Sequence, residues 1–79
     1  MDEFEKFLRK IDTKLRKQIR QAIMAIAQNQ LDGWDIKPLK GHPGAFRCRV
    51  RTVRIIFMRT DYGNALCGIG FRGNVYGRR

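Results

Sequence analysis

AFRCRVRTVRIIFM, the stretch from residue 45 to residue 58, alternates apolar with mostly basic side chains in two short runs. The alternating apolar residues of the two runs are Phe46, Cys48, Val50, Val53, Ile55 and Phe57. Because successive side chains of a strand point to opposite faces, this period of two predicts two strands with one apolar face. The brief connection at Arg51 and Thr52 predicts that these strands pair antiparallel across a tight turn.

A third strand is expected after the turn residues Asp61–Asn64. Beyond that turn, one set of apolar residues alternates with Leu66, Gly68 and Gly70, and it consists of Ala65, Cys67, Ile69 and Phe71. We expect this set to face the core, with Cys48 and Cys67 as reduced core thiols. Phe71 is expected in the core as well.

The N-terminal part, residues 3–30, carries apolar side chains at helical spacing. Asp12 and Thr13 are residue types that favour the start of a helix, and they stand in the middle of this run. We therefore expect a short first helix and a longer second one. The Gly- and Pro-containing segment Asn29–Gly44 is predicted to be a loop, held to the core by Trp34 and Ile36.

These elements predict an α+β fold, in which two N-terminal helices pack on a small antiparallel sheet of three strands. With 79 residues, the chain has room for one domain, which we assign to residues 1–79. No apolar run reaches the roughly 20 residues that a membrane-spanning helix needs, and the acidic, amphipathic N-terminus is unlike a signal peptide. We expect a cytoplasmic protein without a membrane partner.

The charge of the chain is strongly positive, with a formal net charge of +10 at pH 7. It is also uneven, because residues 41–79 contain eight arginines, no lysine and a single acid, Asp61. Such an excess repels itself and is typical of a protein with a polyanionic partner. Arginine suits phosphate in particular, since its planar fork donates two hydrogen bonds at once.

Strand alternation places Arg47, Arg49 and Arg54 on the face opposite the apolar side chains. Like charges on neighbouring strands repel, so this grouping favours a bound anion such as an RNA backbone. Arg72 and Tyr76 follow the last strand and would add a phosphate contact and a ring that stacks on a base. The alternative is an ordinary solvated sheet face, which would carry mixed charges.

The sequence allows more than one role for several other polar residues. Four basic residues lie away from the apolar stripe of the second helix, either as a solvated face or as RNA contacts: Lys14, Arg16, Lys17 and Arg20. The one histidine, His42, is expected at the surface of the loop. With two cysteines and one histidine we expect no metal site and no cofactor.

Four motifs together resemble the RelE/ParE superfamily of bacterial toxins. They are IKPLKG at residues 36–41, FRCRV at 46–50, VRIIF at 53–57 and RGNVY at 72–76. The resemblance covers residues 4 to 76 in element order. It implies a RelE-like fold, from which the family's usual first strand, ahead of the helices, is missing.

The resemblance also implies a function, that of a ribosome-dependent mRNA endonuclease held inactive by a cognate antitoxin. Its partners would be mRNA on the ribosome, ribosomal RNA and the antitoxin. In such toxins the 2′-hydroxyl attacks the adjacent phosphate and leaves a 2′,3′-cyclic end. Carried over, Arg47 and Arg49 match the basic positions of the second strand, Arg54 the phosphate-binding arginine, and Tyr76 the C-terminal tyrosine. Further RNA contacts are expected from Arg51, Arg72, Lys40, Lys14 and Lys17.

This sequence departs from the family at the positions where a proton must move. Relatives often carry lysine, glutamate or histidine there, whereas this chain has Arg47 and Arg49, and Gly70 and Phe71 precede the closing arginine. Arginine holds its proton and is a poor base. The general acid and base are therefore unassigned, and two alternatives stay open: a ParE-like protein that poisons DNA gyrase, and an RNA- or ribosome-binding domain without catalysis.

Overall fold

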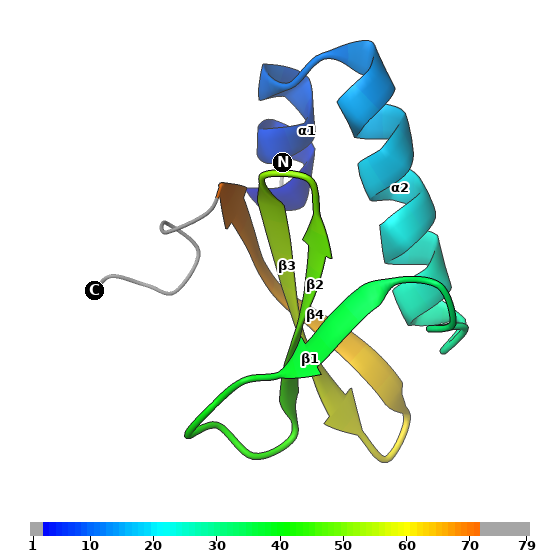
Figure 1. Cartoon of the computed structure of the whole chain (residues 1–79), viewed down its shortest axis with the longest axis vertical. Helices are drawn as coiled ribbons and strands as arrows, with labels where there is room; N and C mark the ends of the chain where they lie inside the picture. The colour runs from blue at the N-terminus through cyan, green and yellow to red at the C-terminus, as the bar shows by residue number, and fades with distance from the viewer. Residues whose placement is uncertain (1–2, 72–79) are drawn as a thin grey trace.

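The computed structural model describes residues 3–71, in which two helices are followed by four strands (Figure 1). The elements are α1 (Glu3–Lys10), α2 (Thr13–Ala27), β1 (Asp35–Pro38), β2 (Ala45–Val50), β3 (Val53–Thr60) and β4 (Gly63–Phe71). This arrangement confirms the predicted α+β class with its two N-terminal helices. Within residues 3–71, no helix combines the length and the apolar character needed to cross a membrane.

The break between the two helices occurs where the N-cap residues predicted it. Asp12 has extended backbone angles, and its Oδ1 accepts a hydrogen bond of 2.8 Å from the backbone N–H of Leu15. Arg16 strengthens the same corner, because its guanidinium donates to the backbone carbonyls of Leu8 and Ile11 at 2.8 and 2.9 Å. These carbonyls lie near the end of α1, where backbone acceptors lack partners within the helix. Arg16 is thus a half-buried link between the helices, a role that neither of the two interpretations from the sequence included.

The sheet has the strand order β1-β2-β3-β4, and every neighbouring pair is antiparallel. The turn between β2 and β3 consists of Arg51 and Thr52, with Arg51 in a left-handed conformation at a φ of 57°. The predicted hairpin between β3 and β4 is confirmed. Its chain reversal ends at Gly63, whose φ of 125° favours glycine.

Strand β1 corrects the predicted loop and raises the number of strands from three to four. Residues 35–38 pair with β2, with Asp35 opposite Arg49 and Pro38 opposite Phe46. Ile36 packs against the core, so this segment alternates as a strand does. A proline is tolerated at this place because β1 is an edge strand, where an N–H facing outward has no partner to lose.

A bulge in β4 corrects the predicted orientation of its first half. Ile56 pairs with Gly68, whereas the next residue of β3, Phe57, pairs with Leu66, so that Cys67 is the extra residue between them. Leu66 therefore faces the helices. Ala65 and Cys67, which were expected in the core, are exposed. Both cysteines are free, but only Cys48 is buried.

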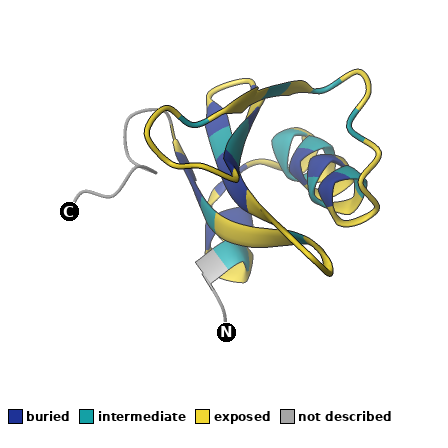
Figure 2. Ribbon diagram, turned by 90° about the horizontal axis from the view of Figure 1, so that it is seen from below, coloured by how far each residue is buried: buried dark blue, intermediate teal, exposed yellow. Residues whose placement is uncertain are grey.

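The core lies between the helices and one face of the sheet. Figure 2 shows buried residues where these two layers meet. Ile19 and Ile26 of α2 and Val53, Ile55 and Phe57 of β3 are at most 1% exposed. Phe71 lies at the margin of this core, since its ring contacts that of Phe7 at 5.0 Å but remains 39% exposed. Phe71 was expected in the core, and it lies at the exposed edge of the core instead.

Candidate nucleic-acid interface

The face of the sheet that turns away from the helices is basic, and we call it the open face. Its side chains alternate with the core residues along each strand. In β1, β2 and β3 the residues of the open face are Asp35, Lys37, Ala45, Arg47, Arg49, Arg54, Ile56 and Met58. The structure therefore places the three predicted arginines on one face.

Arg49 and Arg54 stand directly opposite each other in the register of β2 and β3. The Cβ atoms of such a pair are typically about 4.5–5.5 Å apart, and like charges at that separation are destabilising. Arg49 is exposed and Arg54 is half-buried. Two guanidiniums can therefore approach the same anion from neighbouring strands.

Arg47 lies between Lys37 of β1 and Ile56 of β3. Its side chain is half-buried, and its Nη1 is buried without a hydrogen-bond partner among residues 3–71. In that part of the chain, neither Arg47 nor Arg49 forms an ion pair. Burying a charged donor without a partner is unfavourable, so this nitrogen lowers the stability of the fold.

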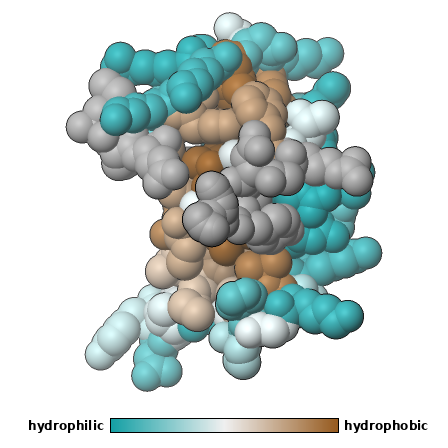
Figure 3. Space-filling model, turned by 90° about the vertical axis from the view of Figure 1, so that its left-hand side faces the viewer, coloured by the Kyte–Doolittle hydropathy of each residue, from teal (hydrophilic) through white to brown (hydrophobic). Residues whose placement is uncertain are grey.

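Strand β4 places glycines beside these arginines. Gly70 lies opposite Arg54, and Gly68 lies opposite Ile56, so neither partner position carries a side chain. Figure 3 views the molecule from the left-hand side of Figure 1 and shows hydrophilic residues gathered along an apolar band.

Two residues of the open face were missed because β1 was predicted to be a loop. Asp35 lies opposite Arg49, and Lys37 lies opposite Arg47; both are exposed. The alternation of Asp35, Ile36 and Lys37 was the available signal, but it spans too few residues to separate a strand from a loop. Asp35 is the only carboxylate on the open face in the described part of the chain.

The other predicted RNA contacts are not all brought to the open face. The Arg51 Nε donates to Gln18 Oε1 at 3.1 Å, and Arg51, Lys14 and Thr52 line a hollow of about 170 Å³ beside the start of α2. Lys17 is exposed on α2, and Lys40 is exposed in the loop after β1. The predicted contacts of Arg72 and Tyr76 lie outside the described residues.

The sheet carries one strongly perturbed thiol on its core side. Burial raises the pKa of Cys48 to about 11; the carboxylate of Asp35 adds to the increase, and Arg47 opposes it. The thiol is therefore neutral at ordinary pH. It lies on the face opposite the arginines and cannot serve as a nucleophile for a ligand of the open face.

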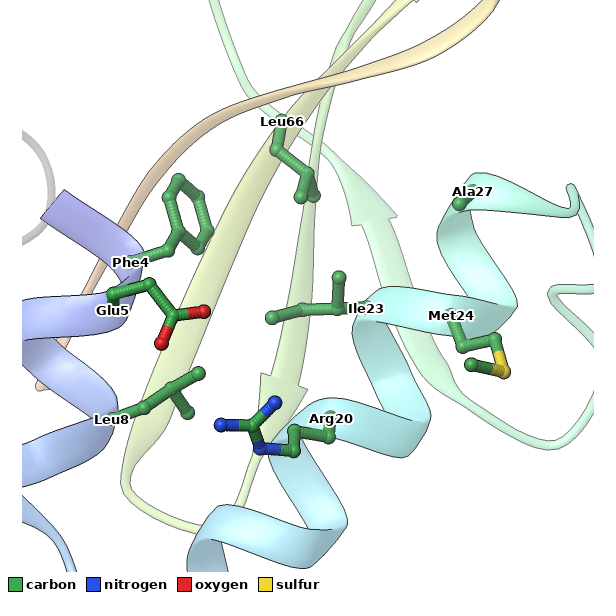
Figure 4. A pocket seen from close by; sticks show the side chains of 8 residues that line it. All are labelled: Phe4, Glu5, Leu8, Arg20, Ile23, Met24, Ala27 and Leu66. Carbon is green, nitrogen blue, oxygen red and sulfur yellow. The ribbon is translucent and has the colours of Figure 1, made fainter. Parts of the chain in front are cut away.

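A second surface feature lies on the helix side, where α1, α2 and β4 enclose an apolar groove of about 860 Å³ (Figure 4). Its apolar lining consists of Phe4, Leu8, Ile23, Met24, Ala27 and Leu66. Glu5 and Arg20 also line the groove and bring opposite charges to it. Met24 is 61% exposed at this groove.

Comparison with known proteins yields no relative: the chain matches no family profile and no curated protein, and no solved structure resembles it. The resemblance to RelE/ParE toxins therefore stays a prediction from the motifs at residues 36–57 and 72–76. Any functional assignment has to rest on the residues themselves and on the geometry of the open face.

Proposed function

We propose that the open face binds the backbone of RNA, and that the chain is a RelE-like toxin that cleaves mRNA on the ribosome. The observation that carries the proposal is the gathering of Arg47, Arg49 and Arg54 on the sheet face that turns away from the helices. Arg49 and Arg54 are paired across two strands despite their repulsion. A phosphate between them would turn that repulsion into attraction, which is what a backbone-binding face requires.

The same three guanidiniums suit the chemistry of RNA cleavage. When a 2′-hydroxyl attacks its neighbouring phosphate, negative charge increases on the phosphoryl oxygens in the transition state. Donors that are already in place stabilise this charge without reorganising. Arg49 and Arg54 would clamp the phosphoryl group from two strands, and Arg47 on the same face of β2 would add a third positive charge.

The cleavage activity is tested by adding the purified protein to a translating extract and mapping the ends of the message. We expect new 3′ ends that carry 2′,3′-cyclic phosphate. Arg54→Ala removes one donor to the developing charge, and a loss of this kind corresponds to about 3 kcal/mol, or at least 100-fold in rate.

Arg59→Ala is the matched control for this experiment. Arg59 belongs to the same strand as Arg54, but it lines a different hollow, together with Asp32 and Trp34. We expect cleavage at the wild-type rate from Arg59→Ala. Intact message at high concentrations of the wild-type protein, or full activity in Arg54→Ala, would contradict the proposal.

A second candidate function is protein binding, and the apolar groove between α1, α2 and β4 favours it. In this case the chain would act as a ParE-like poison of DNA gyrase, or the groove would hold the cognate antitoxin through apolar side chains. The gyrase function predicts double-strand breaks in DNA that depend on gyrase, together with intact message in the extract. RNA binding without any new ends or breaks would instead indicate a non-catalytic RNA- or ribosome-binding domain.

A further inference from the structure

The open face holds one group whose chemistry differs from that of its basic neighbours, the carboxylate of Asp35 on β1. Asp35 lies directly opposite Arg49, which in turn lies opposite Arg54. Three neighbouring strands therefore place a carboxylate and two guanidiniums in one row across the sheet. Partners in adjacent strands have Cβ atoms about 4.5–5.5 Å apart, so the row covers about two such spacings, and its three side chains can approach the same nucleotide.

We propose that Asp35 is the general base of RNA cleavage, the group that removes the proton from the attacking 2′-hydroxyl. The inference rests on the proposed function. A carboxylate accepts hydrogen bonds and can take up a proton, which no arginine of the open face can do. Asp35 is exposed and therefore accessible to a nucleotide held by Arg49.

Four other titratable groups among residues 3–71 are less suited to this role by position or chemistry. Charged Lys37 has donors and no acceptor. Cys48 lies on the core side, and the pKa of its thiol is about 11. His42 belongs to the connection between β1 and β2, and Tyr62 to the turn between β3 and β4, so neither lies on the strands that carry the arginines.

The reaction balances with water as the only additional reactant. Asp35 takes the 2′-hydroxyl proton while the 2′ oxygen forms a bond to phosphorus and the bond from phosphorus to the 5′ oxygen breaks. The products are a 2′,3′-cyclic phosphate and a 5′ alkoxide, which takes a proton from water. The resulting hydroxide removes the proton from Asp35 and restores the carboxylate. During these steps Arg49 and Arg54 neutralise the charge on the phosphoryl oxygens.

Asp35→Asn tests the assignment, with Asp61→Asn as the matched control. Both substitutions remove one negative charge, but Asp61 lies in the turn between β3 and β4. The cleavage rate is measured on mRNA-programmed ribosomes at saturating protein. The affinity is measured separately with a 2′-O-methyl RNA, which lacks the attacking hydroxyl and cannot be cut.

We expect Asp35→Asn to reduce the saturated rate at least 100-fold, as a lost general base does, and to bind 2′-O-methyl RNA as tightly as the wild type or more tightly. Asp35→Glu, which keeps the carboxylate, should recover most of the rate. Asp61→Asn should leave the rate unchanged. This split between rate and affinity distinguishes a base from a residue that only positions Arg49.

Three outcomes would overturn the inference. Wild-type activity in Asp35→Asn would show that another group takes the proton, while the proposed nuclease function would stand. Equal losses of rate and affinity would show that Asp35 only orders the binding face. A wild-type protein that fails to cleave would instead contradict the nuclease function itself, and the role of Asp35 with it.

Discussion

Arg47 combines three unfavourable features at the scale of the single residue. It stands opposite Lys37, its Nη1 is buried without a partner among the described residues, and it forms no ion pair there. Residues that lower the stability of a fold and form no compensating structural contact are typical of functional sites. In the proposed function, the compensation is the positive charge that Arg47 brings to a bound phosphate.

Replacing Arg47 by methionine should therefore stabilise the free protein and weaken RNA binding. Methionine keeps the aliphatic stem that packs on the sheet but removes the charge. We expect the free energy of unfolding in urea to rise by about 0.5–1 kcal/mol, through relief of the repulsion from Lys37 and of the unmet hydrogen bond. Arg59→Met serves as the control on β3. A lower stability of Arg47→Met would mean that Arg47 supports the fold.

Cys48 predicts a dependence of stability on alkaline pH. Its pKa is raised from 9.0 to about 11 in the folded protein, so above pH 9 the thiol ionises in the unfolded chain while it stays protonated in the fold. The unfolded chain then binds fewer protons, and stability falls as pH rises. The contribution of the neutral Cys48 thiol to the free energy of unfolding is fully present below pH 9 and is lost as the pH rises towards 11.

The difference in unfolding free energy between the wild type and Cys48→Ala isolates this effect from other titrations. It should be constant below pH 9 and should shrink between pH 9 and pH 11, by at most about 1.4 kcal/mol per pH unit. Unfolding in urea at several pH values measures it. A difference that stays constant up to pH 11 would mean that the thiol ionises equally in both states.

At the scale of the elements, periodicity predicted α1, α2, β2 and β3 because each carries a sustained apolar pattern. Strand β1 escaped prediction because it has four residues and ends in a proline, and Asp35 and Lys37 were missed with it. The bulge in β4 could not be predicted for a different reason. Leu66 and Cys67 are both apolar, so their order does not reveal which one faces the core.

Long side chains limit predictions from helical spacing in a similar way. Arg16 lies off the apolar stripe of α2, and its spacing therefore indicated solvent. Its guanidinium nevertheless reaches back to the carbonyls of Leu8 and Ile11. The positions of the arginines on the open face could be predicted, because in a strand the alternation alone decides the face.

The N-cap of α2 provides a prediction at the same scale. Asp12→Ala removes the acceptor for the N–H of Leu15 and should lower the free energy of unfolding by about 1 kcal/mol. Asp32→Ala, in the connection between α2 and β1, is the control for the loss of a carboxylate. Urea unfolding distinguishes the two variants. An unchanged stability of Asp12→Ala would show that Arg16 and the core hold the helix corner without the cap.

At the scale of the whole molecule, the two layers separate two kinds of surface. The helix side carries an apolar groove, and the opposite side of the sheet carries the arginines. A net charge of +10 attracts any polyanion, so affinity for RNA alone cannot locate the binding face. The salt dependence of binding can locate the face. Each phosphate that a cation neutralises releases counterions, and this release steepens the fall of affinity with salt.

The most direct test of the open face is the salt dependence of binding to a single-stranded 2′-O-methyl RNA. It should be measured for the wild type, for the double variant Arg47→Gln with Arg49→Gln, and for the control Arg9→Gln with Lys10→Gln on α1. We predict that the open-face variant loses about 1.4 from the slope of log affinity against log salt, at about 0.7 per phosphate contact, while the α1 variant keeps the wild-type slope. Equal slopes in the two variants would contradict the assignment of RNA binding to the open face.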